Sequence, residues 1–193
     1  QGKLGGLSKK AQEVGDVLAA SGKDIIIFET VGVGQAEHDI ISAADLSIVV
    51  LVPESGDEVQ LMKAGIIEIG DIFVINKSDR KGANKLASKL KNILHFFNKE
   101  NINEPEVYNT CATEGKGIVE LYLGIQNCIK IMKENNTLKF RKIKRYEKRI
   151  TELVNESLIK SFWSDKRKLL LKELINLSNL DLLSPEKIAK KIT

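Results

Sequence analysis

The sequence predicts an α/β fold: a doubly wound, mostly parallel sheet followed by an all-helical C-terminal extension. Four short stretches rich in Ile and Val alternate with segments of helical periodicity, the order that parallel strands and crossover helices produce. These stretches are apolar almost without alternation, as strands buried on both faces are. No further strand pattern occurs after about residue 137. We therefore expect a sheet domain over residues 1–136 and a helical extension over residues 137–193.

Strands and helices are predicted in a regular order along the sheet domain. The predicted strands read DIIIFE, DLSIVVLV, DIFVIN and PEVYNT and occupy residues 24–29, 45–52, 71–76 and 105–110. Apolar residues recur at three- and four-residue spacing from Leu86 to Phe97 and from Ile118 to Met132. This spacing predicts two amphipathic helices that cover the sheet.

Residues 137–193 have helical patterns throughout. A long basic amphipathic helix runs through Tyr146, Ile150 and Leu158, a second apolar helix covers residues 169–177, and Ser184 before Pro185 predicts the cap and first turn of a last helix. So much leucine on a short extension predicts that it either packs back on the sheet or pairs with another copy of the chain.

Composition places the chain among ordinary globular proteins with one sizeable core. Of its 193 residues 42% are hydrophobic and 29% charged, and no apolar run approaches the roughly 18 residues of a membrane span. The chain begins with Gln1 and no secretory leader follows. Cys111 and Cys128 lack metal-ligand spacing, which predicts reduced thiols, no zinc site and no disulfide. We expect a cytoplasmic or organelle-matrix protein without a membrane anchor.

Charge is distributed unevenly along the chain. Residues 1–136 carry 15 Lys and Arg against 19 Asp and Glu, whereas residues 137–193 carry 15 against 7. The basic excess is concentrated in FRKIKRYEKR at 140–149, which suits an acidic partner or nucleic acid, and equally an ordinary solvated helix face. Aromatic residues make up only 5% of the chain, which offers little surface for base stacking, and we expect no nucleic-acid partner.

A polar motif follows the predicted strand at 71–76, at the end of the sheet where ligands bind in open parallel sheets. It consists of Asn76, Lys77, Ser78 and Asp79. A carboxylate at Asp79 can accept hydrogen bonds from both the N1–H and the exocyclic amine of guanine, a donor pair that adenine lacks. Asn76 would tie the neighbouring loops together and reach the base edge, and the stem of Lys77 would lie along the base plane. The motif predicts a guanine pocket.

A second motif follows the first predicted strand. Glu29 closes that strand, and Gly32 and Gly34 in ETVGVGQAE let the backbone approach a bulky anion. A carboxylate beside such a turn suits a metal-bound phosphate, although an ordinary strand-to-helix turn explains the same residues.

A third motif, TCATEGKG at 110–117, follows the last predicted strand. The backbone N–H of Ala112, flanked by Cys111 and Thr113, is expected to donate to the guanine O6. A plain turn closed by Gly115 and Gly117 is the alternative. The order of the three motifs on successive strands predicts guanine-nucleotide binding.

With these motifs the sequence resembles the MeaB/ArgK family of P-loop GTPases, which assist adenosylcobalamin-dependent methylmalonyl-CoA mutase. The resemblance rests on LGGLS at 4–8, ETVGVGQAE at 29–37, the stretch from ADLSIVV to NKSD at 44–79, and CATEGKGI at 111–118. It implies a homodimeric, P-loop GTPase-like protein that binds GTP and GDP with Mg²⁺, hydrolyses GTP and acts as a metallochaperone-type switch for such a mutase.

The resemblance also implies roles for individual residues. Glu29 would hold Mg²⁺ and contribute to catalysis, residues from Gly32 to Gln35 would sense the γ-phosphate, and Gln35 would orient the attacking water. The C-terminal helices would form the dimerisation arm. An additional switch loop at 53–63 would relay the nucleotide state to the mutase through Asp57, Gln60 and Lys63.

One element of the family pattern is absent from these 193 residues. No G-x-x-x-x-G-K-[ST] phosphate loop occurs, since LGGLSKK at 4–10 neither follows a strand nor has that spacing. The loop lies upstream in the family, so we expect the chain to be the C-terminal portion of a longer protein that binds nucleotide feebly by itself. The alternative is a non-hydrolysing module for dimerisation and mutase binding.

Overall fold

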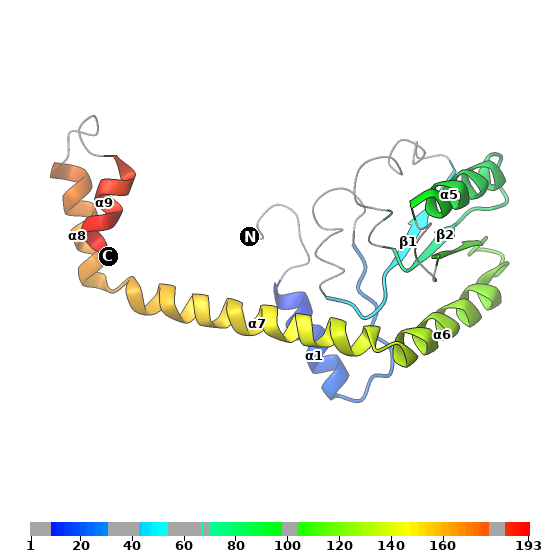
Figure 1. Cartoon of the computed structure of the whole chain (residues 1–193), viewed down its shortest axis with the longest axis horizontal. Helices are drawn as coiled ribbons and strands as arrows, with labels where there is room; N and C mark the ends of the chain where they lie inside the picture. Colours follow the sequence, from blue (N-terminus) through cyan, green and yellow to red (C-terminus); the bar gives the residue numbers. More distant parts are fainter. Residues whose placement is uncertain (1–8, 31–42, 54–66, 68–69, 98–103, 178–183) are drawn as a thin grey trace. The chain divides into compact units, whose positions relative to one another are not determined.

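The computed structural model describes residues 9–30, 43–53, 67, 70–97, 104–177 and 184–193. The chain forms two compact units, Gln1–Ile143 and Lys144–Thr193 (Figure 1). In the described ranges, all strands belong to the first unit.

The first unit is built on a parallel sheet of three strands in the order β1-β2-β3. The strands are β1 (Ile48–Leu51), β2 (Ile72–Ile75) and β3 (Glu106–Asn109), and their register pairs Leu51 with Ile75 and Ile75 with Asn109. All three strands therefore end at the same edge of the sheet, where the loops after β2 and β3 begin side by side. The predicted α/β class with parallel strands is confirmed.

The prediction of a strand at 24–29 is wrong. These residues form no strand, and the Ile25 and Ile27 side chains are 71% and 86% exposed. Phe28 instead packs on helix α1 (Lys9–Ala20), where its ring lies so close to Gly15 that a Cβ at that position would overlap it. An apolar run becomes a strand only where a neighbouring strand completes its hydrogen bonds, and no described strand pairs with this segment.

Helix α5 (Ala83–Phe97) covers one face of the sheet (Figure 1). Its Leu86, Leu90 and Leu94 are fully buried and pack in one core cluster with Phe73 and Ile75 of β2. Their four-residue spacing places the three leucines on one side of the helix. The helix predicted between Leu86 and Phe97 is confirmed, and the strand beneath it is the most deeply buried of the three.

Helix α6 (Ile118–Glu134) packs on the opposite face. Val107 of β3 joins the core under α5, so the side chain of the next residue, Tyr108, points to the other face. Gly124 of α6 approaches Tyr108 so closely that any Cβ would overlap the tyrosine ring. The helix predicted from Ile118 to Met132 is thereby confirmed, with a glycine at its contact with the sheet.

The amino ends of β1 and β2 are held by a side chain of helix α7 (Thr137–Phe162). Arg141 donates from its two terminal nitrogens to the two carboxylate oxygens of Asp71, both at 2.7 Å, and also to the Asp45 carbonyl at 2.9 Å. The backbone N–H and the hydroxyl of Ser47 donate to Asp71 at 2.8 and 2.9 Å. Hydrogen bonding to Asp71 raises the pKa of Arg141 above its ordinary value. We call Ser47, Asp71 and Arg141 the Arg141 clamp.

The second unit contains α8 (Asp165–Leu177) and α9 (Pro185–Ile192). Ile188 and Ile192 of α9 are buried. Ser184 and Pro185 begin that helix as the sequence predicts, but the Ser184 side chain makes no capping hydrogen bond. By contrast, α7 has no buried residue. Among the described helices, none combines the length and apolar character needed to cross a membrane.

Candidate functional site

The loops after β2 and β3 are joined beyond the carboxyl edge of the sheet. The Thr110 N–H donates to the Ile75 carbonyl at 2.9 Å, and the Ser78 N–H donates to the Thr110 carbonyl at 2.9 Å. The Asn76 N–H donates to the Leu51 carbonyl at 2.8 Å and so reaches the end of β1. The parallel register places these groups opposite one another, so the backbone of three strands fixes this corner.

The Asn76 side chain links the same two loops. Its Oδ1 accepts hydrogen bonds from the Thr110 hydroxyl and from the Ala112 N–H, both at 3.2 Å. An amide has a carbonyl end that accepts and an NH₂ end that donates, so two donors that meet at one end identify it as the oxygen. The Asn76 NH₂ group is therefore turned away from Thr110 and Ala112.

A tight turn follows Asn76 and presents Asp79. Lys77 has a positive φ of 57°, a left-handed conformation uncommon for a residue with a Cβ, and its carbonyl accepts from the Arg80 N–H at 3.0 Å. The turn leaves both Lys77 and Asp79 exposed. Strain of this kind at a strand end is typical of ligand sites.

The Asp79 carboxylate is held in its charged form. A hydrogen bond from the Cys111 side chain is the largest cause that lowers its pKa below the ordinary value of 3.8, followed by a hydrogen bond from its own backbone N–H. The positive charges of Arg80 and Lys77 lower the pKa further. At neutral pH Asp79 is thus an ionised acceptor for two N–H donors.

The loop from Thr110 to Gly117 is closed by its own backbone. The Cys111 N–H donates to the Lys116 carbonyl at 2.9 Å, and the Lys116 N–H donates back to the Cys111 carbonyl at 3.2 Å. Gly117 has a φ of 75°, and a Cβ there would overlap the Asn109 carbonyl. The Cys111 side chain is buried and lies 3.5 Å from the Thr113 hydroxyl. This loop holds Ala112 beside Asn76.

The structure brings together the predicted residues of the motif at 76–79 and the motif at 110–117. Those residues are Asn76, Lys77, Asp79, Cys111, Ala112 and Thr113. The Ala112 N–H, expected to face a guanine O6, donates here to Asn76. The loops after β2 and β3 lie side by side, so the Ala112 N–H is within reach of the Asn76 amide oxygen.

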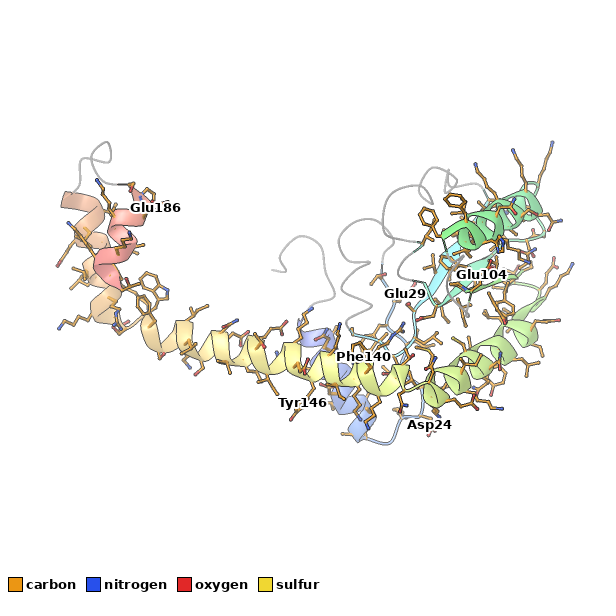
Figure 2. All side chains as sticks on the ribbon, viewed as in Figure 1. Asp24, Glu29, Glu104, Phe140, Tyr146 and Glu186 are labelled. Atoms are coloured by element: carbon orange, nitrogen blue, oxygen red, sulfur yellow. The ribbon has the colours of Figure 1, made fainter. Side chains whose placement is uncertain are left out.

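The predicted phosphate and switch residues are not joined to this cluster by any described contact. Glu29 is exposed in the extended segment that follows α1 (Figure 2). Five further predicted residues, Gly32, Gln35, Asp57, Gln60 and Lys63, lie outside the described residues. Within the described ranges, no three His, Cys, Asp or Glu side chains converge as metal ligands.

Two residues of the cluster belong to the predicted motifs but receive no role from the sequence. Thr110 is 2% exposed and uses its N–H, carbonyl and hydroxyl to join the two loops, and Ser78 contributes the N–H that bonds to it. Their position inside the two motifs is the only sequence signal for them, because their contacts depend on strand pairing. The complete cluster offers an ionised carboxylate and an amide NH₂ at one edge, which suits a flat heterocycle with N–H donors and a ring acceptor.

Comparison with known proteins identifies the family of the chain. Residues 1–167 match the family described as methylmalonyl Co-A mutase-associated GTPase MeaB. A Pyrococcus abyssi protein that carries the name of a GTPase is 42% identical over 158 residues, which cover 80% of this chain and 49% of that protein. The mitochondrial methylmalonic aciduria type A homolog of Mus musculus is 30% identical over 83% of this chain and 40% of its own length.

A further relative is the GTPase ArgK of Escherichia coli, which is 34% identical over 64% of this chain and 39% of its own length. The chain spans about half the length of the curated Pyrococcus relatives that it matches. A match over residues 1–167 covers most of the 193 residues. The chain therefore belongs to the MeaB family of methylmalonyl-CoA mutase-associated GTPases.

Proposed function

We propose that this chain supplies the base-reading part of a protein that binds GTP and GDP and hydrolyses GTP. The observation that carries the proposal is the exposed Asp79 carboxylate on the turn after β2, next to the Asn76 amide whose oxygen is held by Thr110 and Ala112. Guanine presents N1–H and an exocyclic amine to such a carboxylate, and its ring nitrogen N7 accepts from an amide NH₂. Adenine lacks the donor pair, so Asp79 selects guanine.

We propose that the exposed stem of Lys77 lies along one face of the base. Ala112 would donate to the guanine O6 once the base displaces its bond to Asn76, and Cys111 and Thr113 would hold that loop in place. The long 3.2 Å bond between Ala112 and Asn76 fits such an exchange, because it is weak.

For hydrolysis we propose that Glu29 helps to hold Mg²⁺, which neutralises charge on the phosphates when it is bound. Mg²⁺ commonly takes only one or two protein carboxylates together with phosphate oxygens, so a single exposed Glu29 fits such a site. Gln35 would orient the attacking water, and Gly32 would let the backbone approach the γ-phosphate. The phosphate loop would come from sequence outside these 193 residues, since none occurs within them.

The proposed biological role is that of a switch that assists an adenosylcobalamin-dependent mutase of the methylmalonyl-CoA mutase type. The family to which the chain belongs is described by that association. Polar residues Asp57, Gln60 and Lys63 would carry the nucleotide state to the mutase.

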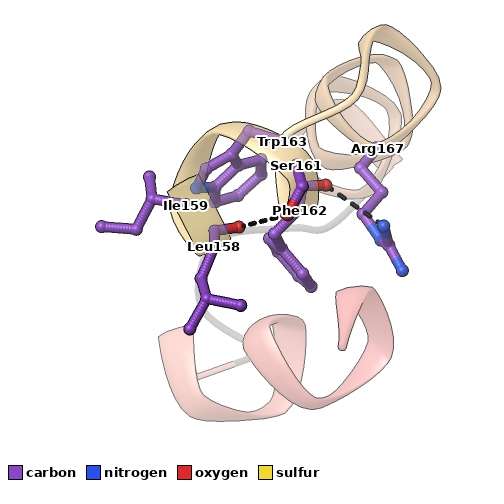
Figure 3. A pocket seen from close by; sticks show the side chains of 6 residues that line it. All are labelled: Leu158, Ile159, Ser161, Phe162, Trp163 and Arg167. Carbon is purple, nitrogen blue, oxygen red and sulfur yellow. Dashed lines mark hydrogen bonds between the residues drawn. The ribbon is translucent and has the colours of Figure 1, made fainter. Parts of the chain in front are cut away.

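We further propose that the helical extension is a dimerisation arm. In the second unit, Leu158, Ile159, Phe162 and Trp163 line an open apolar pocket of about 490 Å³ at the junction of α7 and α8 (Figure 3). The Arg167 guanidinium lies 4.5 Å from the centre of the Phe162 ring. Exposed apolar side chains such as Leu158, Ile159 and Leu169 are typical of protein interfaces where they gather on one surface.

The test of the base pocket is Asp79→Asn in the full-length protein to which the chain belongs. Calorimetric titration should show that affinity for GDP falls about 100-fold, because two hydrogen bonds to a charged acceptor are lost. The preference for GDP over ADP should disappear with it. Xanthosine diphosphate has a carbonyl oxygen at position 2, where guanine has an amine, and the Asn amide of Asp79→Asn can donate to that oxygen. This variant should therefore bind xanthosine diphosphate better than GDP.

The matched control is Glu114→Gln, which neutralises an exposed carboxylate on the adjoining loop and should leave all three affinities unchanged. Unchanged discrimination between GDP and ADP in Asp79→Asn contradicts the assignment of the base pocket. Absence of any GDP binding by the full-length wild type favours the alternative, a non-hydrolysing module for dimerisation and mutase binding. The absence of a phosphate loop from the 193 residues is the observation behind that alternative.

A further inference from the structure

Thr110 lies at the centre of the loop cluster but does not face the proposed ligand. Its side chain is 2% exposed, and its hydroxyl lies 3.2 Å from Asn76 Oδ1. Its backbone groups bond to Ile75 and Ser78 and are fixed by strand pairing. Among the polar groups of Thr110, the hydroxyl is therefore the one that bonds to another side chain of the cluster.

The orientation of the Asn76 amide depends on donors to its oxygen. Two donors reach Oδ1 in this structure, the Ala112 N–H and the Thr110 hydroxyl. The first is lost when a ligand carbonyl takes the Ala112 N–H. Only the Thr110 hydroxyl then holds the oxygen inward, and without it the amide can rotate about its last side-chain bond, whose torsion is broad and roughly two-fold.

We infer that Thr110 is a positioning residue: its buried hydroxyl keeps the Asn76 NH₂ group turned toward the ligand and thereby selects a base with a ring-nitrogen acceptor at that edge. This inference rests on the proposed guanine-nucleotide binding. In guanine the acceptor is N7. Thr110 touches no part of the base and acts only through Asn76.

The test compares GDP with 7-deaza-GDP, which carries a C–H in place of the N7 acceptor. In the full-length wild type, calorimetric titration should show GDP binding about fivefold tighter, the factor expected for one hydrogen bond. Thr110→Val keeps the side-chain shape and removes the donor, so the ratio of the two affinities should fall to about one. Thr110→Ser retains the hydroxyl and should retain the wild-type ratio.

Thr151→Val is the matched control, because the Thr151 hydroxyl donates to the Glu147 carbonyl of its own helix α7 and belongs to none of the motifs of the loop cluster. It should leave the GDP to 7-deaza-GDP ratio unchanged. A purely structural role of Thr110 predicts that both ligands lose affinity equally in Thr110→Val and that the ratio stays at its wild-type value. That result overturns the inference while the proposed function stands.

Thr110→Cys replaces the valine variant if the latter does not fold, since a thiol is a weak donor of similar size. Its ratio should lie between that of the wild type and one, and a wild-type ratio again overturns the inference. If the wild type binds both nucleotides equally, Asn76 does not read N7 and the inference is wrong. If it binds neither, the proposed function fails and the inference fails with it.

Discussion

At the scale of single residues, the contact between Cys111 and Asp79 joins a buried thiol to an exposed carboxylate. Thiols are weak hydrogen-bond donors, yet this one is the largest cause of the lowered pKa of Asp79. A carboxyl group with a lowered pKa favours the folded state at pH values above its unfolded pKa, and this contribution disappears as the pH falls through the folded pKa. The relevant pH range therefore lies below the ordinary value of 3.8.

Cys111→Ala should raise the pKa of Asp79 toward its ordinary value, because the side-chain donor is removed. Carbon NMR of the Asp79 carboxyl group in the chain described here measures this directly and needs no nucleotide. Cys111→Ser keeps a donor and should keep the lowered pKa. On acidification, the affinity for guanine nucleotides should begin to fall at a higher pH in Cys111→Ala than in Cys111→Ser. Equal Asp79 pKa values in the wild type and Cys111→Ala would show that the thiol does not act on the carboxylate.

The residues of the proposed base pocket differ in how far sequence could predict them. Asp79 and Asn76 are predictable because they follow an apolar strand directly, which is a local pattern. The sequence also predicts that Asn76 ties the neighbouring loops together. It does not identify Thr110 and Ala112 as the donors, because these contacts depend on which strands pair and in which register. A side-chain hydrogen bond between residues 34 positions apart leaves no trace in local periodicity.

At the scale of elements, the Arg141 clamp fastens α7 to the starts of two strands. Arg141 and Asp71 are 26% and 16% exposed as side chains, so their bidentate pair is partly shielded from solvent. Pairs with this geometry contribute more than exposed ion pairs, which are worth about 0–1 kcal/mol. The clamp also holds residues just ahead of β1, and it therefore aligns both strands from their amino ends.

A double-mutant cycle on Arg141→Ala and Asp71→Ala should give a coupling free energy of about 1–3 kcal/mol in chemical unfolding. The control is the exposed pair of Lys168 and Asp165, whose nitrogen and oxygen lie 3.3 Å apart, and its coupling should stay below about 0.5 kcal/mol. Equal couplings for both pairs would contradict a special role of the clamp.

The elements also show where sequence periodicity fails. Helices α5 and α6 were predictable because their apolar spacing is local, whereas the segment at 24–29 has a strand-like composition but no described strand beside it. Composition indicates that a segment can form a strand. The availability of a partner along the sheet edge decides whether it does.

At the scale of the whole molecule, the two units differ in how they bury apolar side chains. The first has a core of leucine, isoleucine and phenylalanine side chains between α5 and the sheet. In the described part of the second, Ile188 and Ile192 are the buried apolar residues, while Leu158, Ile159 and Leu169 are 58–60% exposed. So small a buried core gives little stability to a unit of this size, which is why we propose that a second copy covers it.

Sedimentation analysis of the chain at micromolar concentration should therefore show a dimer. Leu158→Asp places a charge in the apolar pocket and should shift the chain to monomer, with little effect on folding because this side chain is already 60% exposed. Lys160→Asp, a charge change at an exposed position of the same helix, should leave the dimer intact. A wild-type chain that sediments as a monomer rules out the arm as a self-association surface.

The bond between Ala112 and Asn76 has a consequence for how a nucleotide enters and leaves. Because the Ala112 N–H already has an acceptor, a guanine base that binds as we propose would exchange one oxygen acceptor for another. When that base leaves, the N–H would return to the Asn76 oxygen and would not lack an acceptor. The base edge would therefore present a low kinetic barrier in both directions, and contacts to the phosphates would set the lifetime of the bound nucleotide.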